Sequence, residues 1–306
     1  MSWTIEDTIL IMAGSGYAYD GLKREGYYVQ HPYRGNGLFH RILRELCFRI
    51  PFLPKKPWFV RPKRATEIKN IVIWDTLITK DYLNWLKKEC PNAKINFTYN
   101  NLVTKAKHLM PSQIPEGIRV WTYDCADADK YSINLYSTHP YCTAYLRPLE
   151  EPAYDVFFVG RDKGRAEFLL GLERDMKALG LKTDFVIAKD GLLSHNKPYY
   201  SKELSYQDMI DHLVRSRAVL NVVMPGQKGI TLRDIESVFF GVKLITTNKS
   251  IADYGFINRK NVFILGVDKF EDLKEFLKTE TEKEDFELLQ KHTFSAYLNE
   301  ITNWTE

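Results

Sequence analysis

The chain has 306 residues, of which 44% are hydrophobic and 27% charged, so it is long enough to bury one large α/β core or two smaller ones. Its formal net charge of +4 is too small to argue for nucleic-acid binding by itself. The four cysteines form no C-x-x-C pair and no two histidines have metal-ligand spacing, which indicates free thiols in a reducing compartment and no metal site.

The N-terminal segment TILIMAG (8–14) is the first expected strand, and it ends in a glycine loop at Gly14, Ser15 and Gly16. Acidic residues precede this short apolar run, which is not the pattern of a secretory signal. No apolar run approaches the roughly 20 residues that a membrane-spanning helix needs. We therefore expect a cytoplasmic protein, with peripheral attachment to the inner face of the cell membrane left open.

Residues 38–64 are unusually basic, with eight Lys and Arg against one acid, Glu45. Their apolar residues follow one helical stripe: Phe39, Ile42, Leu43, Leu46 and Ile50. A basic amphipathic helix followed by aromatic residues suits an anionic membrane surface. We expect that surface to comprise Arg41, Arg44, Lys55, Lys56, Trp58 and Phe59. A helix that faces the core is the common alternative, and nucleic-acid binding is a third that no recognised motif supports.

Apolar runs alternate with helical patterns along the rest of the chain. Strands are expected at 70–75, 94–99, 119–124, 155–160, 183–188, 218–223, 243–248 and 261–266, and helices at 79–90, 165–180, 205–216 and 231–241. This alternation implies parallel sheets. The proline-containing segment 146–155 is typical of a linker. A long charged helical pattern from about Glu271 carries three spaced aromatics, Phe294, Tyr297 and Trp304.

These patterns predict two α/β domains and a returning C-terminal helix. The expected boundaries are 1–148 for the first domain, 149–285 for the second, and 286–306 for a helix that packs back on the first domain.

The run WTYDCADADKY holds Asp124, Asp127 and Asp129. The pair Asp127 and Asp129 matches the D-x-D that chelates Mn²⁺ in GT-A glycosyltransferases. So short a motif often arises by chance, so we interpret the run as a structural loop and keep a metal-dependent GT-A transferase as an alternative.

The turn VGRDKGR directly follows the strand expected at 155–160. Gly160 begins it, and Arg161, Lys163 and Arg165 concentrate positive charge at the carboxyl end of that strand. Such a turn can clamp a phosphate, although it has neither the P-loop nor the dinucleotide glycine pattern. A solvated turn is the alternative.

The stretch VVMPGQKGITLRDIE has the pattern of strand, glycine loop and helix. Thr231 and Asp234 have capping-box spacing, which predicts that a helix starts near Thr231. A helix start attracts anions, and Arg233 adds a guanidinium that can grip phosphate oxygens. Glu236 on the same helix suits the two hydroxyls of a ribose. The residue chemistry alone fits equally well a capped helix on which Arg233 and Glu236 form a solvated ion pair and bind no ligand.

The order of VGRDKGR, TDFVIA, SYQDMIDHLVRSRAVLNVV and GQKGITLRDIESVFFGVKLITTN resembles the nucleotide-sugar-binding half of GT-B glycosyltransferases, over about 150–270. The segment G-Q-x-G-x-T-x-R-x-x-E is similar to that of bacterial capsule and lipopolysaccharide biosynthesis proteins. The resemblance implies two Rossmann-like domains that face a cleft. It also implies metal-independent transfer of a sugar, from a nucleoside-diphosphate donor of the UDP type, to a lipid-linked surface-polysaccharide intermediate.

The resemblance further implies a donor-binding role for a set of residues in the C-terminal half: Gly160, Arg161, Lys163, Arg165, Lys189, Tyr206, Gln227, Gly229, Thr231, Leu232, Arg233 and Glu236. Arg161 and Arg233 would contact the diphosphate and Glu236 the ribose, while the Gly14–Gly16 loop would face the acceptor. The first acid of the family's E-x7-E pair would fall near Lys228, where no acid stands. The resemblance therefore assigns a role only to Glu236, which matches the second acid of this pair.

Three residues are candidates for the general base of an inverting reaction: Asp75, Asp124 and His139. A retaining enzyme needs no such base and relies on electrostatics at the phosphate. Two competing functions stay open. A NAD-dependent oxidoreductase would need a G-x-G-x-x-G motif that the glycine loops do not supply, and a non-catalytic GT-B-like subunit would dock through residues 38–64.

Overall fold

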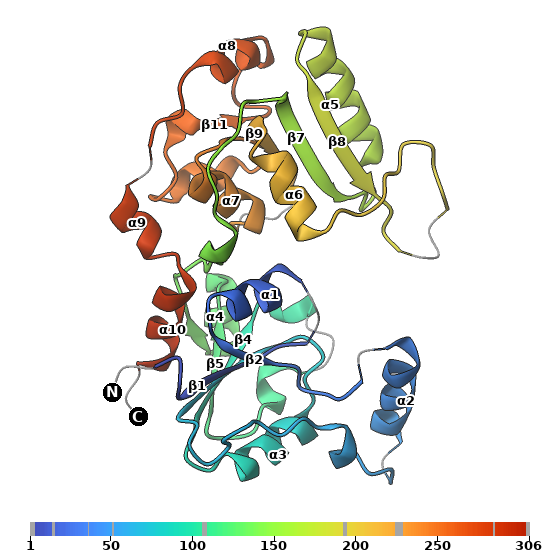
Figure 1. The fold of residues 1–306 in the computed structure, drawn as a ribbon, viewed down its shortest axis with the longest axis vertical. Helices are drawn as coiled ribbons and strands as arrows, with labels where there is room; N and C mark the ends of the chain where they lie inside the picture. The colour runs from blue at the N-terminus through green and yellow to red at the C-terminus, as the bar shows by residue number, and fades with distance from the viewer. Residues whose placement is uncertain are drawn as a thin grey trace. The chain divides into compact units, whose positions relative to one another are not determined.

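The structure is a computed structural model that describes residues 4–13, 16–35, 37–50, 52–105, 109–191, 195–223, 229–283 and 285–303. The chain forms two compact units (Figure 1). Unit 1 comprises Met1–Ala144 and His292–Glu306, and unit 2 comprises Tyr145–Lys291. The predicted class is confirmed, because each unit is an α/β fold built on a parallel sheet.

Unit 1 has a six-stranded sheet of order β2-β1-β3-β4-β5-β6, parallel throughout. Its strands are β1 Thr8–Ile11, β2 Tyr28–Gln30, β3 Asn70–Trp74, β4 Lys94–Tyr99, β5 Ile118–Thr122 and β6 Asn134–Leu135. Its N-terminal helices are α1 Tyr17–Arg24, α2 Leu38–Arg49, α3 Lys80–Glu89 and α4 Cys125–Tyr131. All four residues of β1 are buried, as expected of a parallel strand covered on both faces.

Unit 2 has a five-stranded sheet of order β11-β10-β9-β7-β8, also parallel. Its strands are β7 Tyr154–Arg161, β8 Thr183–Ala188, β9 Ser216–Asn221, β10 Lys243–Thr246 and β11 Val262–Ile264. The helices between them are α5 Ala166–Ala178, α6 Tyr206–Leu213 and α7 Leu232–Phe240. Its core is separate from that of unit 1 and centres on residues such as Phe158, Leu169 and Ile245.

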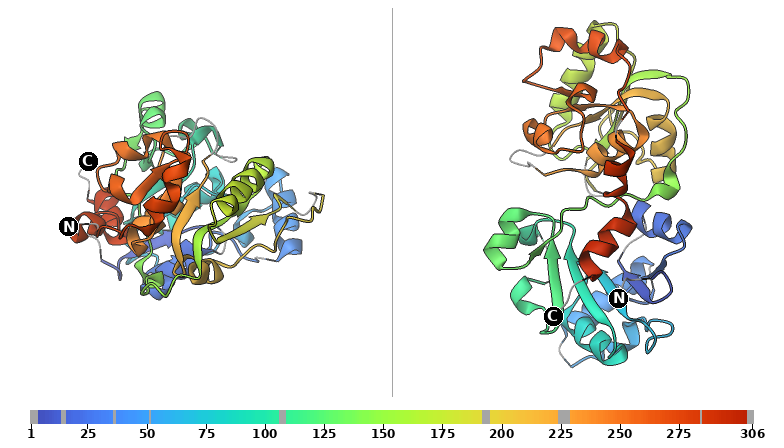
Figure 2. Two further views of the ribbon diagram at one scale, coloured as in Figure 1. Left: turned by 90° about the horizontal axis from the view of Figure 1, so that it is seen from above. Right: turned by 90° about the vertical axis from the view of Figure 1, so that its left-hand side faces the viewer.

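The C-terminal segment forms three short helices, α8 Leu273–Lys278, α9 Phe286–Gln290 and α10 Phe294–Thr302, where the sequence predicts one long pattern. The return of the last helix to unit 1 is confirmed, since α10 lies against the strands of that unit (Figure 2). Phe294 stacks on Trp74 with ring centroids 6.1 Å apart, and Tyr297 meets Tyr136 edge to face at 5.1 Å. Trp304 lies outside the described residues.

Two further differences from the sequence expectations concern local structure. The short strands β2 and β6 were not predicted, because three and two residues are too few to show a period. The segment expected as a loop at Asp124–Asp129 is helix α4. Asp124 caps it, with Oδ1 accepting from the Asp127 N–H at 2.9 Å.

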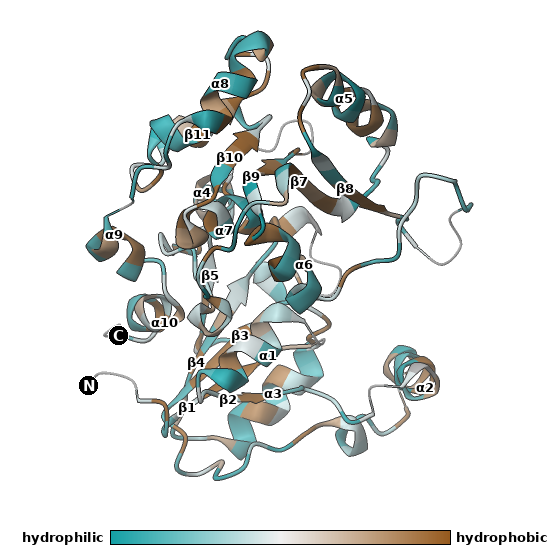
Figure 3. Cartoon of the chain, turned by 45° about the horizontal axis from the view of Figure 1, so that its top comes forward, coloured by the Kyte–Doolittle hydropathy of each residue, from teal (hydrophilic) through white to brown (hydrophobic). Residues whose placement is uncertain are grey.

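Helix α2 carries both polar and apolar residues along its surface (Figure 3). It does not bury its apolar stripe, so the core-facing alternative is wrong. Instead Phe48, on the other side of the helix, packs against the aromatic cluster of Tyr33 and Phe59. In the part of the chain that the structure describes, no helix is long and apolar enough to span a bilayer.

The basic surface predicted from the sequence needs correction at three residues. Phe59 and Arg44 are buried, Phe59 in the core and Arg44 with its guanidinium 4.9 Å from the Tyr33 ring centroid. Lys55 is half-buried and forms an ion pair with Asp81. Burial of Phe59 follows from its contacts with four other aromatic rings: Tyr33, Phe48, Tyr82 and Trp85. Arg41 and Lys56 are exposed as predicted, and Trp58 is half-buried against the core.

Candidate functional site

The candidate site lies at the carboxyl edge of the unit 2 sheet, at its topological switch point. The chain leaves β7 for β8 on one side and later returns as β9 on the other side of β7. The connections after β7 and β9 therefore run in opposite directions from the same edge, which is where ligands bind in open α/β sheets. Both candidate segments of the sequence, 160–165 and 229–236, occupy this edge. Gln227 lies outside the described residues.

The first segment is a tight turn between β7 and α5. Lys163 has a φ of 49° and Gly164 a φ of 76°, so two successive residues adopt the left-handed conformation. Asp162 fixes the turn because its Oδ1 accepts from the Ala166 N–H at 2.7 Å and its Oδ2 accepts from the Tyr200 hydroxyl at 2.6 Å. The Lys163 N–H donates to Asp190 Oδ1 at 2.8 Å. The turn is therefore preformed, with the Lys163 side chain exposed.

Arg161 ends β7 with its guanidinium in solvent. It donates to Glu203 at 3.0–3.2 Å and to the Asp190 carbonyl at 3.3 Å. An exposed ion pair of this kind contributes little, about 0–1 kcal/mol. A diphosphate can therefore displace Glu203 at small cost, and Arg161 stays a candidate for phosphate binding.

Arg165 connects the two loops of the site. Its Nη1 donates to the Val222 carbonyl just after β9, and its Nη2 donates to the Arg161 carbonyl at 3.3 Å. Burial lowers the pKa of this guanidinium, which also lies over the Phe158 ring at 5.6 Å. The predicted contact between Arg165 and a phosphate is corrected here, because its guanidinium instead binds carbonyl groups of both loops and links them. A Cβ at Gly160 would approach Arg165 Nη2 to 3.0 Å, so a larger residue there would require this guanidinium to shift.

The second segment opens helix α7 with the predicted capping box, which is confirmed. The Thr231 N–H donates to Asp234 Oδ2 at 2.8 Å. Asn221, the last residue of β9, donates to Thr231 Oγ1 at 2.9 Å and to Asp234 Oδ1 at 2.6 Å. Asp234 is fully buried, and burial raises the pKa of its carboxyl. Among the described residues, the backbone N–H groups of Leu232 and Arg233 have no partner, as is usual for the first turn of a helix.

Arg233 and Glu236 face each other on α7, three residues apart. Arg233 Nη1 is in ion-pair contact with Glu236 Oε2, and Glu236 Oε1 accepts from the Tyr206 hydroxyl at 2.8 Å. Glu236 is fully buried, and burial raises the pKa of its carboxyl above the ordinary value. The sequence alternative of a solvated Arg–Glu pair is therefore wrong, because Glu236 is fully buried and the side chain of Arg233 is only 17% exposed.

In the structure Arg233 and Glu236 are paired with each other, whereas the resemblance assigns Arg233 to the diphosphate and Glu236 to the ribose. Glu236 Oε2 contacts Arg233 Nη1 in the ion pair, and a carboxylate oxygen has a further lone pair that can accept a hydrogen bond. A ribose reaches that oxygen only if Arg233 turns outward, which would also aim its guanidinium at a diphosphate. Tyr206 is then a support of Glu236, and its ring meets Tyr145 edge to face at 4.7 Å.

The remaining donor-side residues lie at the same edge. Lys189 directly follows β8, the neighbour of β7, and is half-buried. Gly229 precedes Thr231 in the approach to α7, where a small residue leaves the backbone open to a ligand.

Asp75 occupies the corresponding edge of unit 1. It follows β3, which pairs with β1, and β1 is the strand at which the order of this sheet reverses. Burial raises the pKa of the Asp75 carboxyl, while a hydrogen bond from the Asn100 N–H at 3.1 Å opposes that shift. Gly14 and Ser15 lie outside the described residues, and Gly16 precedes helix α1.

The other two candidate bases have structural roles. Asp124 caps α4, as described above. Burial lowers the pKa of His139 to about 4, and its ring stacks on that of His292 at 5.6 Å. His139 therefore belongs to the contact between the C-terminal segment and unit 1, and we withdraw both residues as candidate bases.

The two acids of the D-x-D do not converge on one ion. Asp127 is buried with Oδ2 accepting from the Val103 N–H at 2.7 Å, while Asp129 is exposed. Residues two apart on a helix point in opposite directions. This geometry disfavours the metal-dependent GT-A alternative.

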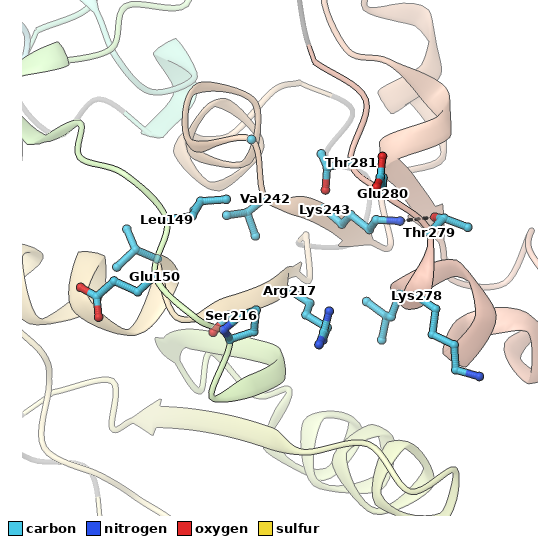
Figure 4. Close-up of a pocket in the computed structure, with 14 residues that line it drawn as sticks. Leu149, Glu150, Ser216, Arg217, Val242, Lys243, Lys278, Thr279, Glu280 and Thr281 are labelled. Atoms are coloured by element: carbon cyan, nitrogen blue, oxygen red, sulfur yellow. Dashed lines mark hydrogen bonds between the residues drawn. The ribbon is translucent and has the colours of Figure 1, made fainter.

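A hollow of unit 2, of about 230 Å³, lies at the opposite, amino edge of the sheet (Figure 4). Lys243, at the start of β10, donates to the Phe276 carbonyl and to Thr279 Oγ1. Arg217 forms an ion pair with Asp155 at 3.3 Å. Both cations have partners, and the hollow lies at the edge opposite to the one where open α/β sheets bind their ligands, so we favour the carboxyl edge as the anion site.

Sequence reasoning missed four polar residues that organise the site: Asn221, Asp190, Tyr200 and Glu203. Asn221 could have been noticed from the sequence, because it is the one polar residue within the apolar run AVLNVV (218–223). The other three come from a segment with no period, and their contacts with the turn are 27 to 42 residues distant in sequence.

No protein-family model matches this chain, and no curated protein matches it. Among solved structures, MurG of Acinetobacter baumannii aligns over 97% of this chain and 96% of its own at 14% identity, with a TM-score of 0.40. A 2-hydroxyacid dehydrogenase of Ketogulonicigenium vulgare Y25 aligns over 89% and 92% at 10% identity, with a TM-score of 0.22. An NAD⁺-bound 3-phosphoglycerate dehydrogenase of Entamoeba histolytica aligns over 95% and 90% at 11% identity, also with a TM-score of 0.22. Likenesses this distant identify no family.

Proposed function

We propose that the protein is a glycosyltransferase that moves a sugar from a nucleoside-diphosphate donor, of the UDP type, to a lipid-linked surface-polysaccharide intermediate. One observation carries the proposal. The switch point of unit 2 brings the basic turn of Arg161 and Lys163 to the same edge as the start of α7, where the buried carboxylate of Glu236 is paired with Arg233. Anion-binding groups beside an acceptor for sugar hydroxyls match the two polar parts of a nucleoside diphosphate.

The proposed donor contacts follow from this placement. The diphosphate lies at the N–H groups of Leu232 and Arg233 in the first turn of α7, with Arg161 and Lys163 opposite. Arg233 turns from Glu236 toward the phosphates, and Glu236 Oε2 accepts from a ribose hydroxyl. These cations supply the positive charge that a leaving diphosphate needs, so the proposed reaction requires no metal.

Asp75 is the proposed general base. Its carboxylate takes the proton from the acceptor hydroxyl while that oxygen bonds to the anomeric carbon, and the bond from this carbon to the diphosphate breaks. A raised pKa brings a carboxyl closer to neutral pH, where proton transfer is more effective.

Turnover of Asp75→Asn tests this function. The assay is release of nucleotide from UDP-, GDP- and CMP-sugars, with water as the acceptor. We expect a loss of about 10²-fold or more relative to the native chain, with nucleotide affinity unchanged, because only proton transfer is removed.

Asp124→Asn is the matched control, since this aspartate caps α4 and is expected to leave nucleotide release unchanged. If Asp75→Asn kept full turnover, Asp75 would not be the general base, and a retaining reaction would be favoured. A native chain that binds nucleotide but releases none from any donor would support the second candidate, a non-catalytic subunit. The exposed face of α2 is the observation in its favour.

A further inference from the structure

Helix α2 presents an uncovered apolar face. The exposed fractions are 69% for Phe39, 52% for Ile42, 37% for Leu43 and 49% for Leu46. These positions follow the spacing i, i+3, i+4 and i+7, so they form one stripe. Phe52, just beyond the helix, is 86% exposed. A contiguous apolar face of this kind on a soluble surface marks an interaction site.

Arginines surround this face. A hollow of about 430 Å³ lies beside α2, lined by Arg41, Ile42, Arg44, Glu45, Leu46, Arg49 and Leu77. Arg41 and Arg49 are exposed, and neither has an ion-pair partner among the described residues. The hollow therefore combines apolar walls with cationic groups.

Arg44 gives the hollow a second, independent feature. Its side chain is only 5% exposed, it lines the hollow, and it has no ion-pair partner within the described ranges. Its recorded contact is with the face of the Tyr33 ring. A buried cation is costly unless it is paired, so the position of Arg44 favours an anionic ligand in this hollow.

We propose that α2 docks on an anionic phospholipid bilayer, with the stripe of Phe39, Ile42, Leu43 and Leu46 among the acyl chains and a lipid phosphate over the three arginines. Charge complementarity decides between occupants. A second copy would bring like charges together around the stripe, and a nucleic acid would leave the stripe uncovered. Helices that lie in a membrane interface combine these features: an apolar face flanked by Arg or Lys.

The inference corrects the surface predicted from the sequence. Trp58 and Phe59 do not insert, because they pack on or in the core. The inserting groups are on α2 itself, together with Phe52. This docking does not rest on the proposed glycosyl transfer, because its groups all lie in unit 1 and its test uses no nucleotide.

Flotation of the full chain with vesicles provides the test. We expect binding to vesicles that contain phosphatidylglycerol and little binding to vesicles of phosphatidylcholine alone. Phe39→Ser should lower the partition coefficient about tenfold or more, because a large apolar group no longer inserts. Arg41→Glu should lower it about tenfold at low salt, because a favourable charge is replaced by an unfavourable one.

Matched controls separate docking from general effects. Phe286→Ser alters an equally exposed phenylalanine of unit 2, at 71%, and Arg174→Glu alters an exposed helical arginine of unit 2. Both should bind like the native chain. Equal binding by Phe39→Ser and the native chain, or no preference for anionic vesicles, would overturn the proposal. Self-association that Phe39→Ser abolishes, without vesicle binding, would assign the face to a second copy instead and also overturn it.

Discussion

Replacing Arg233 by Ala is expected to lower the free energy of unfolding by about 3–5 kcal/mol at pH 7, the usual cost of removing one partner of a buried ion pair. The reason is Glu236, which is fully buried and would lose the cation that is paired with it. Urea unfolding of the full chain measures the change. Arg174→Ala, an exposed arginine on α5, is the control and should change the value by no more than about 0.5 kcal/mol.

The destabilisation of Arg233→Ala should depend on pH and on Glu236. Burial raises the pKa of Glu236 in the folded chain above the ordinary value of 4.5 that applies on unfolding. Between those two pKa values the folded chain holds more protons, so the free energy of unfolding falls as pH rises. The charge of Arg233 opposes this rise, so removing it raises the pKa of Glu236 in the folded chain further. The loss caused by Arg233→Ala should therefore be smallest below pH 4.5 and grow toward neutral pH. The double variant Arg233→Ala with Glu236→Gln should recover most of the loss at pH 7, and a double variant as unstable as the single one would contradict this explanation.

Replacing Glu300 by Ala is expected to loosen helix α10 from unit 1 and to cost about 2–3 kcal/mol of unfolding free energy. Glu300 accepts from the backbone and hydroxyl of both Ser137 and Thr138, at 2.6–3.0 Å. Burial alone would raise the pKa of this carboxyl, but the four donors outweigh it and lower the pKa. Hydrogen exchange of the α10 amides, together with urea unfolding, measures the effect.

Two further variants serve as comparisons for Glu300→Ala. Glu300→Gln keeps the shape but its amide nitrogen cannot accept, so we expect a smaller loss than for Ala. Glu287→Ala on α9 changes an exposed glutamate and should be neutral. Unchanged exchange of α10 in Glu300→Ala would show that the aromatic contacts of Phe294 and Tyr297 hold the helix without the carboxylate.

The regular parts of both units could be predicted because their signals are local. Strands such as NIVIW are continuous apolar runs, and parallel strands covered on both faces require such runs. The start of α7 was predictable for the same reason, since Thr231 and Asp234 interact across three residues. The partners of the basic turn were not, because Glu203 meets Arg161 from 42 residues away.

The difference between local signals and distant contacts also explains why the sequence did not predict the exposure of α2 or the burial of Glu236. An amphipathic stripe fits a core and an interface equally well, and only the fold shows that Phe48 packs inward while Phe39 and Ile42 stay exposed. The pattern R-x-x-E gives the spacing of Arg233 and Glu236. Their burial depends on Tyr206 and Met209, which come from α6.

Calorimetric titration of the full chain with UDP, GDP and CMP tests the central claim most directly, namely that the carboxyl edge of unit 2 holds a nucleoside diphosphate. The account predicts saturable binding of UDP, with affinity reduced about tenfold or more in Arg161→Ala and in Glu236→Gln. Lys202→Ala, an exposed lysine in the same segment as Glu203, should bind like the native chain. Binding of none of the three nucleotides, or UDP binding that neither variant weakens, would contradict it.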